Sequence, residues 1–254
     1  MGRPAPLLVP LARGVTAAFT TRAGGVSGAP FASANLALHV GDDDAAVLAN
    51  RARVAAALGV DAARTTWCEQ VHGDVVATVS KDDAGRGATS LAEAFPGADG
   101  LVTDVSGLPL AVLAADCVPV LLAERHGGVV AAVHAGRRGL ALGVVEVAVG
   151  TLLDLGAERD DVVAAVGPCV GPCCYEVGED VQAEVVEVVP QARARTLGGR
   201  PALDLAAGVR AVLANEGVRA VTTVGGCTAH QPGPYFSYRR DGTTGRQAGI
   251  VWRS

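Results

Sequence analysis

The stretch from residue 110 to residue 139 carries two side chains able to do chemistry, each within an apolar run. Cys117 lies in the first run and His134 ends the second, and the polar, glycine-containing segment 124–128 between them predicts a hairpin loop. With that loop centred between residues 125 and 126, antiparallel pairing places the two side chains opposite each other, with Cβ atoms about 4.5–5.5 Å apart. A thiolate and an imidazole at that separation can reach one metal ion, at about 2.3 Å and about 2.0 Å.

Two features of the same stretch allow a simpler interpretation. Free cysteine is commonly buried, so Cys117 beside a hydrogen-bonded His134 could be ordinary core packing. Pro119 cannot donate to a strand ladder, which indicates an edge strand or a bulge. His72, between Val71 and Gly73, is by itself more typical of a structural histidine than of a ligand.

Arginines near glycines offer candidate anion sites. Arg22 precedes Gly24 and Gly25, and a guanidinium beside exposed backbone N–H groups resembles an anion cradle, although an ordinary turn explains the pattern as well. The segment 135–139, which contains Arg138, precedes an apolar run to about residue 155 that predicts a buried helix. A helix N-terminus with arginines attracts anions.

The other cysteines predict no second metal site. Three of them, Cys169, Cys173 and Cys174, lie in a segment rich in glycine and proline that contains no histidine. We expect a rigid loop with partly buried thiols, and we expect these three and Cys227 to be dispensable for metal binding. Cys174 is the one that could line a substrate pocket.

The remaining pattern predicts one domain, residues 1–254, of mixed α and β structure, without repeats or linkers. Segment 65–79 reads as a strand or hairpin, and segment 81–97 as a mobile loop. The other predicted helices are 43–58, 179–189 and 204–216, and the other predicted strands are 15–21, 98–104, 162–166, 218–224 and 248–252.

Composition excludes several functional classes. The formal net charge of −5, with no long run of either sign, argues against a nucleic-acid binder. No apolar stretch approaches the roughly 20 residues that span a bilayer, and the proline-broken segment 1–14 does not read as a signal peptide. Six cysteines in such a chain read as thiols, which predicts a soluble cytoplasmic protein.

Together, the motifs resemble one family over nearly the full chain, the family named both multicopper polyphenol oxidase (laccase domain) and purine nucleoside phosphorylase. The matching segments are Thr21-Arg22-Ala23-Gly24-Gly25-Val26-Ser27, Asn35-Leu36, His39-Val40-Gly41-Asp42, Gln70-Val71-His72-Gly73, Ala98-Asp99-Gly100, Ala115-Asp116-Cys117, His134-Ala135-Gly136, Gly171-Pro172-Cys173-Cys174-Tyr175-Glu176-Val177 and Phe236-Ser237-Tyr238-Arg239-Arg240.

The resemblance implies an α+β fold, a four-layer α/β/β/α sandwich with mixed sheets, similar to cytotoxic necrotizing factor catalytic domains. It also implies a zinc site made by His72, Cys117 and His134, which would serve as catalytic residues; copper could bind there too. The family usually has a tryptophan where this chain has Arg137, so the resemblance does not predict the shape of the pocket wall at this position.

The expected activity is that of a purine nucleoside phosphorylase and adenosine deaminase. Its partners would be a nucleoside and phosphate, in a monomer or small homo-oligomer. Two imidazoles and one thiolate leave an open zinc position, as in catalytic sites. Residue chemistry makes Arg22, Arg138 and Arg239 candidate phosphate ligands, and Asn35 and Asp116 candidate polar contacts to the substrate or to the ligands.

Three alternatives stay open. A copper-dependent polyphenol oxidase conflicts with the histidine count, since multicopper centres need many histidines and the chain has five. A zinc or thiol amidase acting on a cell-wall peptide precursor would use Cys117 as nucleophile beside His134. A non-enzymatic zinc scaffold fits an open ligand set poorly.

Overall fold

The computed structural model describes residues 3–254, and its strands form two large sheets and one small one. The five-stranded sheet has the order β1 (Leu7–Ala12), β2 (Val15–Phe19), β13 (Gln247–Arg253), β6 (Leu110–Ala114), β3 (Thr66–Trp67). The six-stranded sheet has the order β12 (Ala220–Thr223), β9 (Val162–Val166), β7 (Val118–Glu124), β8 (Val130–Ala135), β5 (Gly100–Thr103), β4 (Val76–Thr78). The small sheet pairs β10 (Arg193–Arg195) with β11 (Pro201–Leu203).

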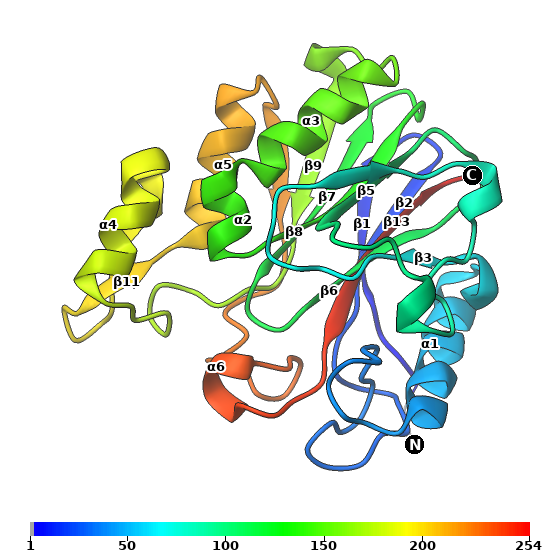
Figure 1. Ribbon diagram of the computed structural model, residues 1–254, viewed down its shortest axis with the longest axis horizontal. Coiled ribbons are helices and arrows are strands. Elements are labelled where there is room, and N and C mark those ends of the chain that lie inside the picture. Colours follow the sequence, from blue (N-terminus) through cyan, green and yellow to red (C-terminus); the bar gives the residue numbers. More distant parts are fainter. Residues whose placement is uncertain (1–2) are drawn as a thin grey trace.

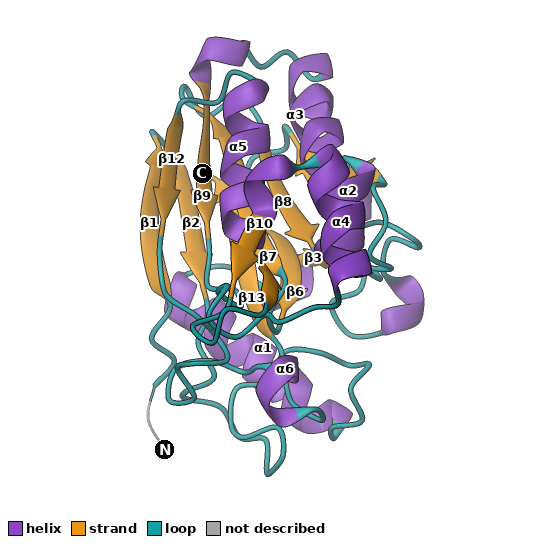
Figure 2. Ribbon diagram, turned by 90° about the vertical axis from the view of Figure 1, so that its left-hand side faces the viewer, coloured by secondary structure: helices purple, strands orange, loops and turns teal. Residues whose placement is uncertain are grey.

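Both large sheets are mixed. In the first sheet, β3 runs parallel to β6 while the other neighbours are antiparallel. In the second, β12 and β4 at the two edges run parallel to their neighbours, and the central pairs are antiparallel. The helices are α1 (Asp44–Leu58), α2 (Arg137–Leu142), α3 (Val144–Asp154), α4 (Glu179–Val188), α5 (Leu205–Asn215) and α6 (Tyr238–Asp241). Figures 1 and 2 show α2, α3 and α5 grouped on one side of the strands and α1 away from them.

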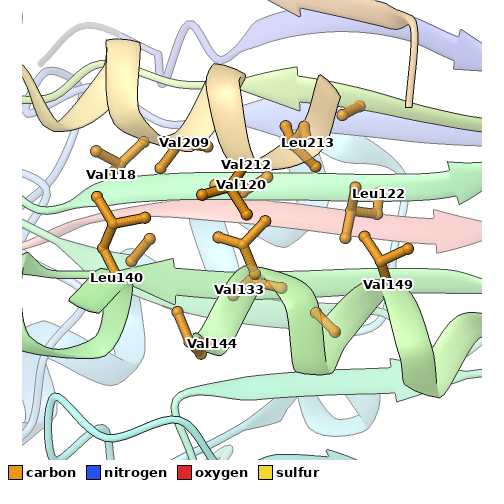
Figure 3. Packing of buried hydrophobic residues seen from close by; sticks show 14 of the residues in the cluster. Val118, Val120, Leu122, Val133, Leu140, Val144, Val149, Val209, Val212 and Leu213 are labelled. Carbon is orange, nitrogen blue, oxygen red and sulfur yellow. The ribbon is translucent and has the colours of Figure 1, made fainter. Parts of the chain in front are cut away.

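The alternation of side chains along β7 shows how the layers stack. Successive strand residues point to opposite faces. Val118, Val120 and Leu122 pack with α2, α3 and α5 in the first hydrophobic cluster, part of which Figure 3 shows, whereas Leu121 and Ala123 pack against the five-stranded sheet. A strand covered on both faces is apolar along most of its length, and β7 is buried throughout, with Glu124 at its end as its one charged residue.

A third cluster joins α1 to the outer face of the five-stranded sheet. Val54 of α1 packs there with Ile250 of β13 and with Trp67 of β3. Helices thus cover both sheets, and the order of layers is α/β/β/α, as predicted. The similarity to cytotoxic necrotizing factor catalytic domains stays a prediction.

Arg51 of α1 fixes the segment that we expected to be a mobile loop. Its buried guanidinium lies 4.0 Å over the Trp67 ring and donates to the carbonyls of Leu36, Gly87 and Ala88. Segment 81–97 also contains two short 3-10 helices, Lys81–Asp83 and Leu91–Glu93. The other short 3-10 helices are Ala62–Arg64, Arg159–Asp161 and Pro190–Ala192.

Two predicted elements differ from the structure. Segment 65–79 is no hairpin, because β3 joins one sheet and β4 the other. The predicted helix after His134 is divided into α2 and α3 at Gly143, whose φ of +96° ends the first helix. The predicted caps of α1 are confirmed, since the Asp43 carboxylate accepts from the Ala45 N–H and Gly59 adopts a left-handed φ of +73°.

The hairpin of β7 and β8 forms as predicted, but its register is shifted by two residues. His134 lies opposite Pro119, not Cys117, which precedes the strand. Pro119 lies inside the sheet, at the end of the β7–β9 pairing, so the edge-strand interpretation is wrong. Within residues 3–254, no helix combines the length and hydrophobicity needed to cross a bilayer.

Candidate metal and substrate site

Two connections that cross from one large sheet to the other meet at one end of the sandwich. One connects β3 to β4 and contains His72, and the other connects β6 to β7 and contains Cys117. His134 lies at the end of β8, beside β7. The topology thus brings together three side chains that are up to 62 residues apart in the sequence, from His72 to His134.

The first crossing is held by a side chain that imitates a strand. The Gln70 amide donates to the Leu113 carbonyl at 2.8 Å and accepts from the Leu113 N–H at 2.7 Å, so it satisfies both backbone groups of that β6 residue. Gln70 and His72 both have positive φ, +53° and +60°. The chain therefore bends sharply here and turns His72 toward Cys117.

Asp99 is the residue that orients both histidines, a role that was not predicted from the sequence. Its buried carboxylate accepts from the N–H groups of Val71, His72 and Gly73 at 2.7–3.0 Å, and it pairs with His134 Nδ1 at 2.8 Å. Burial raises the pKa of Asp99, but the hydrogen bonds from His134 and Gly73 outweigh it and lower the pKa below its ordinary value. The charged carboxylate fixes the His134 tautomer and leaves Nε2 free for a metal.

The three candidate ligands have the right spacing. One donor atom from each of His72, Cys117 and His134 lies within 4.8 Å of the others, and Cys117 Sγ is 3.8 Å from His72 Nε2. The two imidazole rings meet edge to face, with centroids 4.9 Å apart. Zinc bonds of about 2.3 Å to sulfur and about 2.0 Å to nitrogen at tetrahedral angles would place those two atoms about 3.5 Å apart. The donor set therefore fits a zinc-type ion with little movement.

The pKa values of Cys117 and His134 are shifted in directions that favour cation binding by the thiolate. Burial raises the pKa of the Cys117 thiol, but the charge of His134 and hydrogen bonds from His134 and His72 outweigh it and lower the pKa to about 6. Burial lowers the pKa of His134, but the Cys117 charge and the Asp99 hydrogen bond raise it to about 9. Each group thus favours the charged form of the other, thiolate and imidazolium, and a metal ion would replace the imidazolium proton.

Gly136 leaves the space in which the ligands meet. A Cβ atom built at this position would lie 2.8 Å from His72 Cδ2, 3.2 Å from Cys117 Sγ and 3.6 Å from His134 Cε1. Its φ of −78° suits any residue, so the requirement for glycine is one of space alone.

The three ligands line a cavity of about 460 Å³. This volume lies within the range of small-molecule sites, about 300–1,000 Å³. Its wall contains four arginines and two tyrosines, together with smaller polar and apolar groups; the lining residues are His39, Gln70, His72, Leu113, Ala114, Ala115, Asp116, Cys117, His134, Arg137, Arg138, Tyr175, Tyr238, Arg239 and Arg246.

Two of the predicted phosphate ligands lie in this wall. Arg239 donates to the Glu176 carbonyl at 2.8 Å and lies 4.9 Å over the Tyr175 ring. Arg138 is exposed, and its guanidinium makes no hydrogen bond or ion pair with any residue in the described range 3–254. Arg137, where the resemblance led us to expect a tryptophan, is half-buried and pairs with Glu184 of α4 at 3.1 Å. A guanidinium thus forms this part of the wall.

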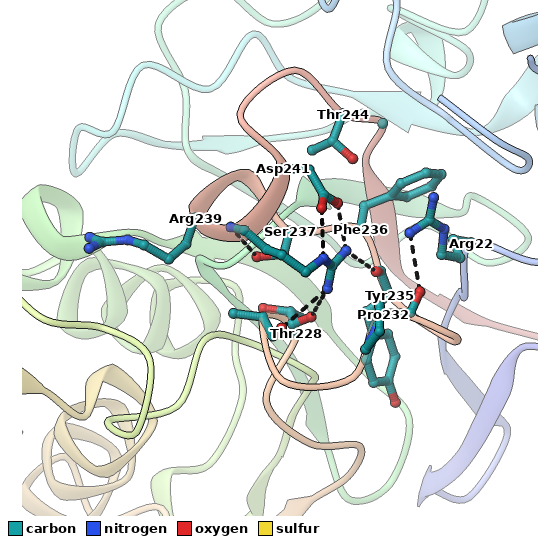
Figure 4. Close-up of polar contacts among 12 residues, drawn as sticks. Arg22, Thr228, Pro232, Tyr235, Phe236, Ser237, Arg239, Asp241 and Thr244 are labelled. Carbon is teal, nitrogen blue, oxygen red and sulfur yellow. Dashed lines mark hydrogen bonds and ion pairs between the residues drawn. The ribbon is translucent and has the colours of Figure 1, made fainter. Parts of the chain in front are cut away.

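The structure does not bring Arg22 and Asn35 into the cavity. Arg22 donates twice to the Ala32 carbonyl and once to Pro232, and it lies over the Phe236 ring at 4.7 Å. In Figure 4 the side chains of Arg22 and Arg239 lie on opposite sides of Asp241. Neighbouring carbonyls thus take the guanidinium donors that we expected phosphate to use.

Asn35 and Asp116 hold loops by hydrogen bonds. The buried Asn35 amide accepts from the Arg246 N–H and donates to Asp42, so it fixes the backbone next to a cavity arginine. The Asp116 carboxylate accepts from Thr228 Oγ1 at 2.5 Å and from the Arg239 N–H at 2.6 Å. Asp116 thus lines the cavity while both of its oxygens are occupied by protein groups.

Besides Asp99, which lies behind the ligands, sequence reasoning missed four residues of the cavity wall, namely His39, Tyr175, Tyr238 and Arg246. Arg246 donates to two neighbouring carbonyls, and its guanidinium lies 5.8 Å from the Tyr238 ring centroid. The family motifs contain His39, Tyr175 and Tyr238, which was the available signal. Arg246 belongs to none of these motifs, so the sequence contained no signal for it.

We expect Asp99→Asn to weaken metal retention by about 10- to 100-fold, because the amide cannot accept all four hydrogen bonds as a carboxylate does. Competition with a chromophoric chelator measures the affinity, and circular dichroism checks that the chain is folded. Asp104→Asn, a change at an exposed aspartate, is the matched control. Unchanged affinity in Asp99→Asn would show that Asp99 does not orient the ligands.

Gly136→Ala should remove the metal while the chain stays folded, since the new methyl group occupies the space between His72 and Cys117. Gly150→Ala, in α3, is the control because a Cβ there meets no atom within 4 Å. Metal content after desalting separates the two variants. Full metal occupancy in Gly136→Ala would contradict the ligand geometry.

Comparison with known proteins gives a consistent result. The family model described as multi-copper polyphenol oxidoreductase laccase matches residues 16–254. A purine nucleoside phosphorylase of Streptomyces coelicolor is 51% identical over 236 residues, which cover 92% of this chain and 93% of the relative. YfiH, described as a hypothetical protein of Bacillus licheniformis, has a crystal structure that is 34% identical, with a TM-score of 0.93 over 99% of this chain and 97% of that chain.

A second solved structure carries both a fold match and a named activity. YlmD from Geobacillus stearothermophilus is 40% identical, with a TM-score of 0.90 over 94% of this chain and 92% of that chain. The same protein is named a purine nucleoside phosphorylase. The chain therefore belongs to the laccase-like polyphenol oxidoreductase family, in which these relatives carry the name purine nucleoside phosphorylase.

Proposed function

We propose that the protein is a zinc-dependent purine nucleoside phosphorylase. It would convert adenosine, inosine or methylthioadenosine and phosphate to the free base and a ribose 1-phosphate, with adenosine deamination as a second activity. The observation that carries the proposal is an open His-Cys-His donor set in the wall of a cavity of about 460 Å³ that four arginines also line.

His72, Cys117 and His134 would hold the metal. Three protein ligands of this kind are typical of catalytic zinc, which keeps a fourth position for water or substrate. When bound, zinc supplies a Lewis acid that can lower the pKa of a water molecule to about 7, as deamination requires. Asp99 keeps the His134 ring in place and balances its charge.

Phosphate needs cationic donors, and the cavity lining offers them. Arg138 has its whole guanidinium available, while Arg239 and Arg246 are held by carbonyls through one nitrogen each. A guanidinium can form paired, charge-assisted hydrogen bonds with phosphate oxygens. The occupied oxygens of Asp116 keep that carboxylate fixed to Thr228 and to the Arg239 backbone.

The nucleoside has an apolar and aromatic surface to lie on. Leu113, Ala114 and Ala115 line the cavity with Tyr175, which is half-buried. Stacking on such faces recognises any purine and excludes water. A copper-dependent polyphenol oxidase is supported less, because only three of the five histidines, His39, His72 and His134, line this cavity.

Arg138→Ala should lower phosphorolysis by about 10- to 100-fold in kcat/KM while deamination changes little, because only phosphorolysis uses phosphate. Assays of ribose 1-phosphate and of ammonia, on the same zinc-loaded sample, measure the two activities. Arg22→Ala is the matched control: its guanidinium binds carbonyls outside the cavity, so any loss should be equal in both reactions. Equal losses in Arg138→Ala would refute the phosphate role.

A second candidate is a thiol amidase acting on a cell-wall peptide precursor. The series Cys117, His134, Asp99 favours it, since a low-pKa thiol beside an imidazole that a carboxylate orients is the arrangement of a nucleophilic cysteine.

Metal removal separates the two candidates. A zinc enzyme loses both nucleoside reactions on treatment with a chelator and regains them with zinc, because its chemistry needs the ion. A thiol amidase would hydrolyse a precursor peptide without metal and lose that activity on alkylation of Cys117. Nucleoside turnover by metal-free protein would exclude the zinc mechanism.

A further inference from the structure

Two loops far apart in the sequence are joined beside the cavity. Cys169, which follows β9, and Cys227, which follows β12, form an isolated parallel bridge, and the Thr228 N–H donates to the Cys169 carbonyl at 2.9 Å. The Gly171 N–H donates to the Cys227 sulfur at 3.2 Å. This pairing brings the two loops into contact and gathers their thiols.

A histidine from the second loop meets the vicinal cysteines of the first. The sulfurs of Cys173 and Cys174 and one ring nitrogen of His230 all lie within 4.8 Å of one another. The two sulfurs are 3.6 Å apart, close to the roughly 3.8 Å that two thiolates on one tetrahedral zinc would have. The Cys227 sulfur lies on the same side of this loop, because a Cβ atom built at Gly171 would be 3.6 Å from both Cys173 Sγ and Cys227 Sγ.

The donors are of one chemical kind. Three sulfurs and an imidazole, with no carboxylate among them, match the Cys₃His sets of structural zinc sites and the preference of soft cations such as Cu⁺. The three cysteines are partly exposed and His230 is exposed, so an ion can enter from solvent. A cluster whose only purpose was apolar packing would exclude solvent from its thiols.

We propose that Cys173, Cys174, Cys227 and His230 form a second site for a soft metal ion, Zn²⁺ or Cu⁺, distinct from the cavity site. Cys173, Cys174 and His230 are already grouped, and Cys227 would move in as the fourth ligand, which would make the site closed and structural. The proposal runs against our expectation that these thiols are dispensable for metal binding. The structure contradicts one premise of that expectation, the absence of a nearby histidine, because His230, more than fifty residues away in the sequence, lies beside them.

The second site would stabilise one wall of the cavity. Tyr175, which lines the cavity, directly follows Cys174, and Thr228, which binds the Asp116 carboxylate, directly follows Cys227. An ion bound by both loops would hold these two contacts in place. The second site does not depend on the proposed reaction, since its ligands would come from the thiol cluster and His230 alone.

The test uses the full chain, reduced, and two metals in separate arms, Zn²⁺ and Cu⁺. After loading and desalting, wild type should retain about two ions per chain and Cys117→Ala about one, if each tetrahedral site holds one ion. Adding Cys173→Ser and His230→Ala to Cys117→Ala should remove the remaining ion. His126→Ala, at another exposed histidine, should leave it in place.

Cobalt gives a second readout that does not need activity. Cobalt-loaded Cys117→Ala should keep an intense thiolate-to-metal absorption band, which Cys173→Ser weakens. If Cys117→Ala fails to fold, His72→Ala replaces it as the background. Retention in only one arm identifies the metal. The proposal is overturned if the Cys117→Ala chain retains neither Zn²⁺ nor Cu⁺. It is also overturned if the cluster substitutions leave the retention of both metals unchanged.

Discussion

The arrangement of this site depends on one buried carboxylate. Asp99 accepts from three consecutive N–H groups of the 71–73 segment and from the His134 ring, and its own carbonyl accepts from the His134 N–H at 2.7 Å. Burying an isolated carboxylate costs several kcal/mol, so the charge is tolerable only while these donors surround it. The requirement that the donors stay together fixes the crossing segment against β8. The position of both histidines therefore follows from satisfying Asp99.

The part of this arrangement that could be predicted from the sequence is local. Cys117 and His134 lie in consecutive apolar runs separated by a short polar loop, and that pattern led to the hairpin and to their proximity. The register was wrong by two residues, because the Glu124 carboxylate binds the N–H groups of His126 and Gly128 and sets the loop one residue further along. Since strand faces alternate with a period of two, a shift of two leaves the side chains on the same face.

What could not be predicted depends on contacts between distant segments. Segment 65–79 has the composition of a hairpin, but Gln70 replaces the strand pairing with its side-chain amide and sends β4 to the other sheet. Arg22 beside glycines has the residue types of an anion cradle, yet a carbonyl more than two hundred residues away, that of Pro232, takes one of its donors. The expectation that no histidine lies near Cys173 and Cys174 was wrong for the same reason, since His230 comes from another loop. In each case the residue types indicated what kind of bond a side chain could form. Contacts between distant segments decided which partner it binds.

Backbone strain lies where the two sheets exchange strands. The non-glycine residues with positive φ in the described range 3–254 are Gln70, His72 and Asp116, at +53°, +60° and +98°, and all three line the cavity. Each such conformation costs about 1–3 kcal/mol and persists only when surrounding bonds fix it. Those bonds are present: Leu113 holds Gln70, Asp99 holds the His72 N–H, and Thr228 with the Arg239 backbone holds Asp116. The strain is thus maintained by the same residues that aim the ligands, and relaxing either crossing would separate His72 from Cys117.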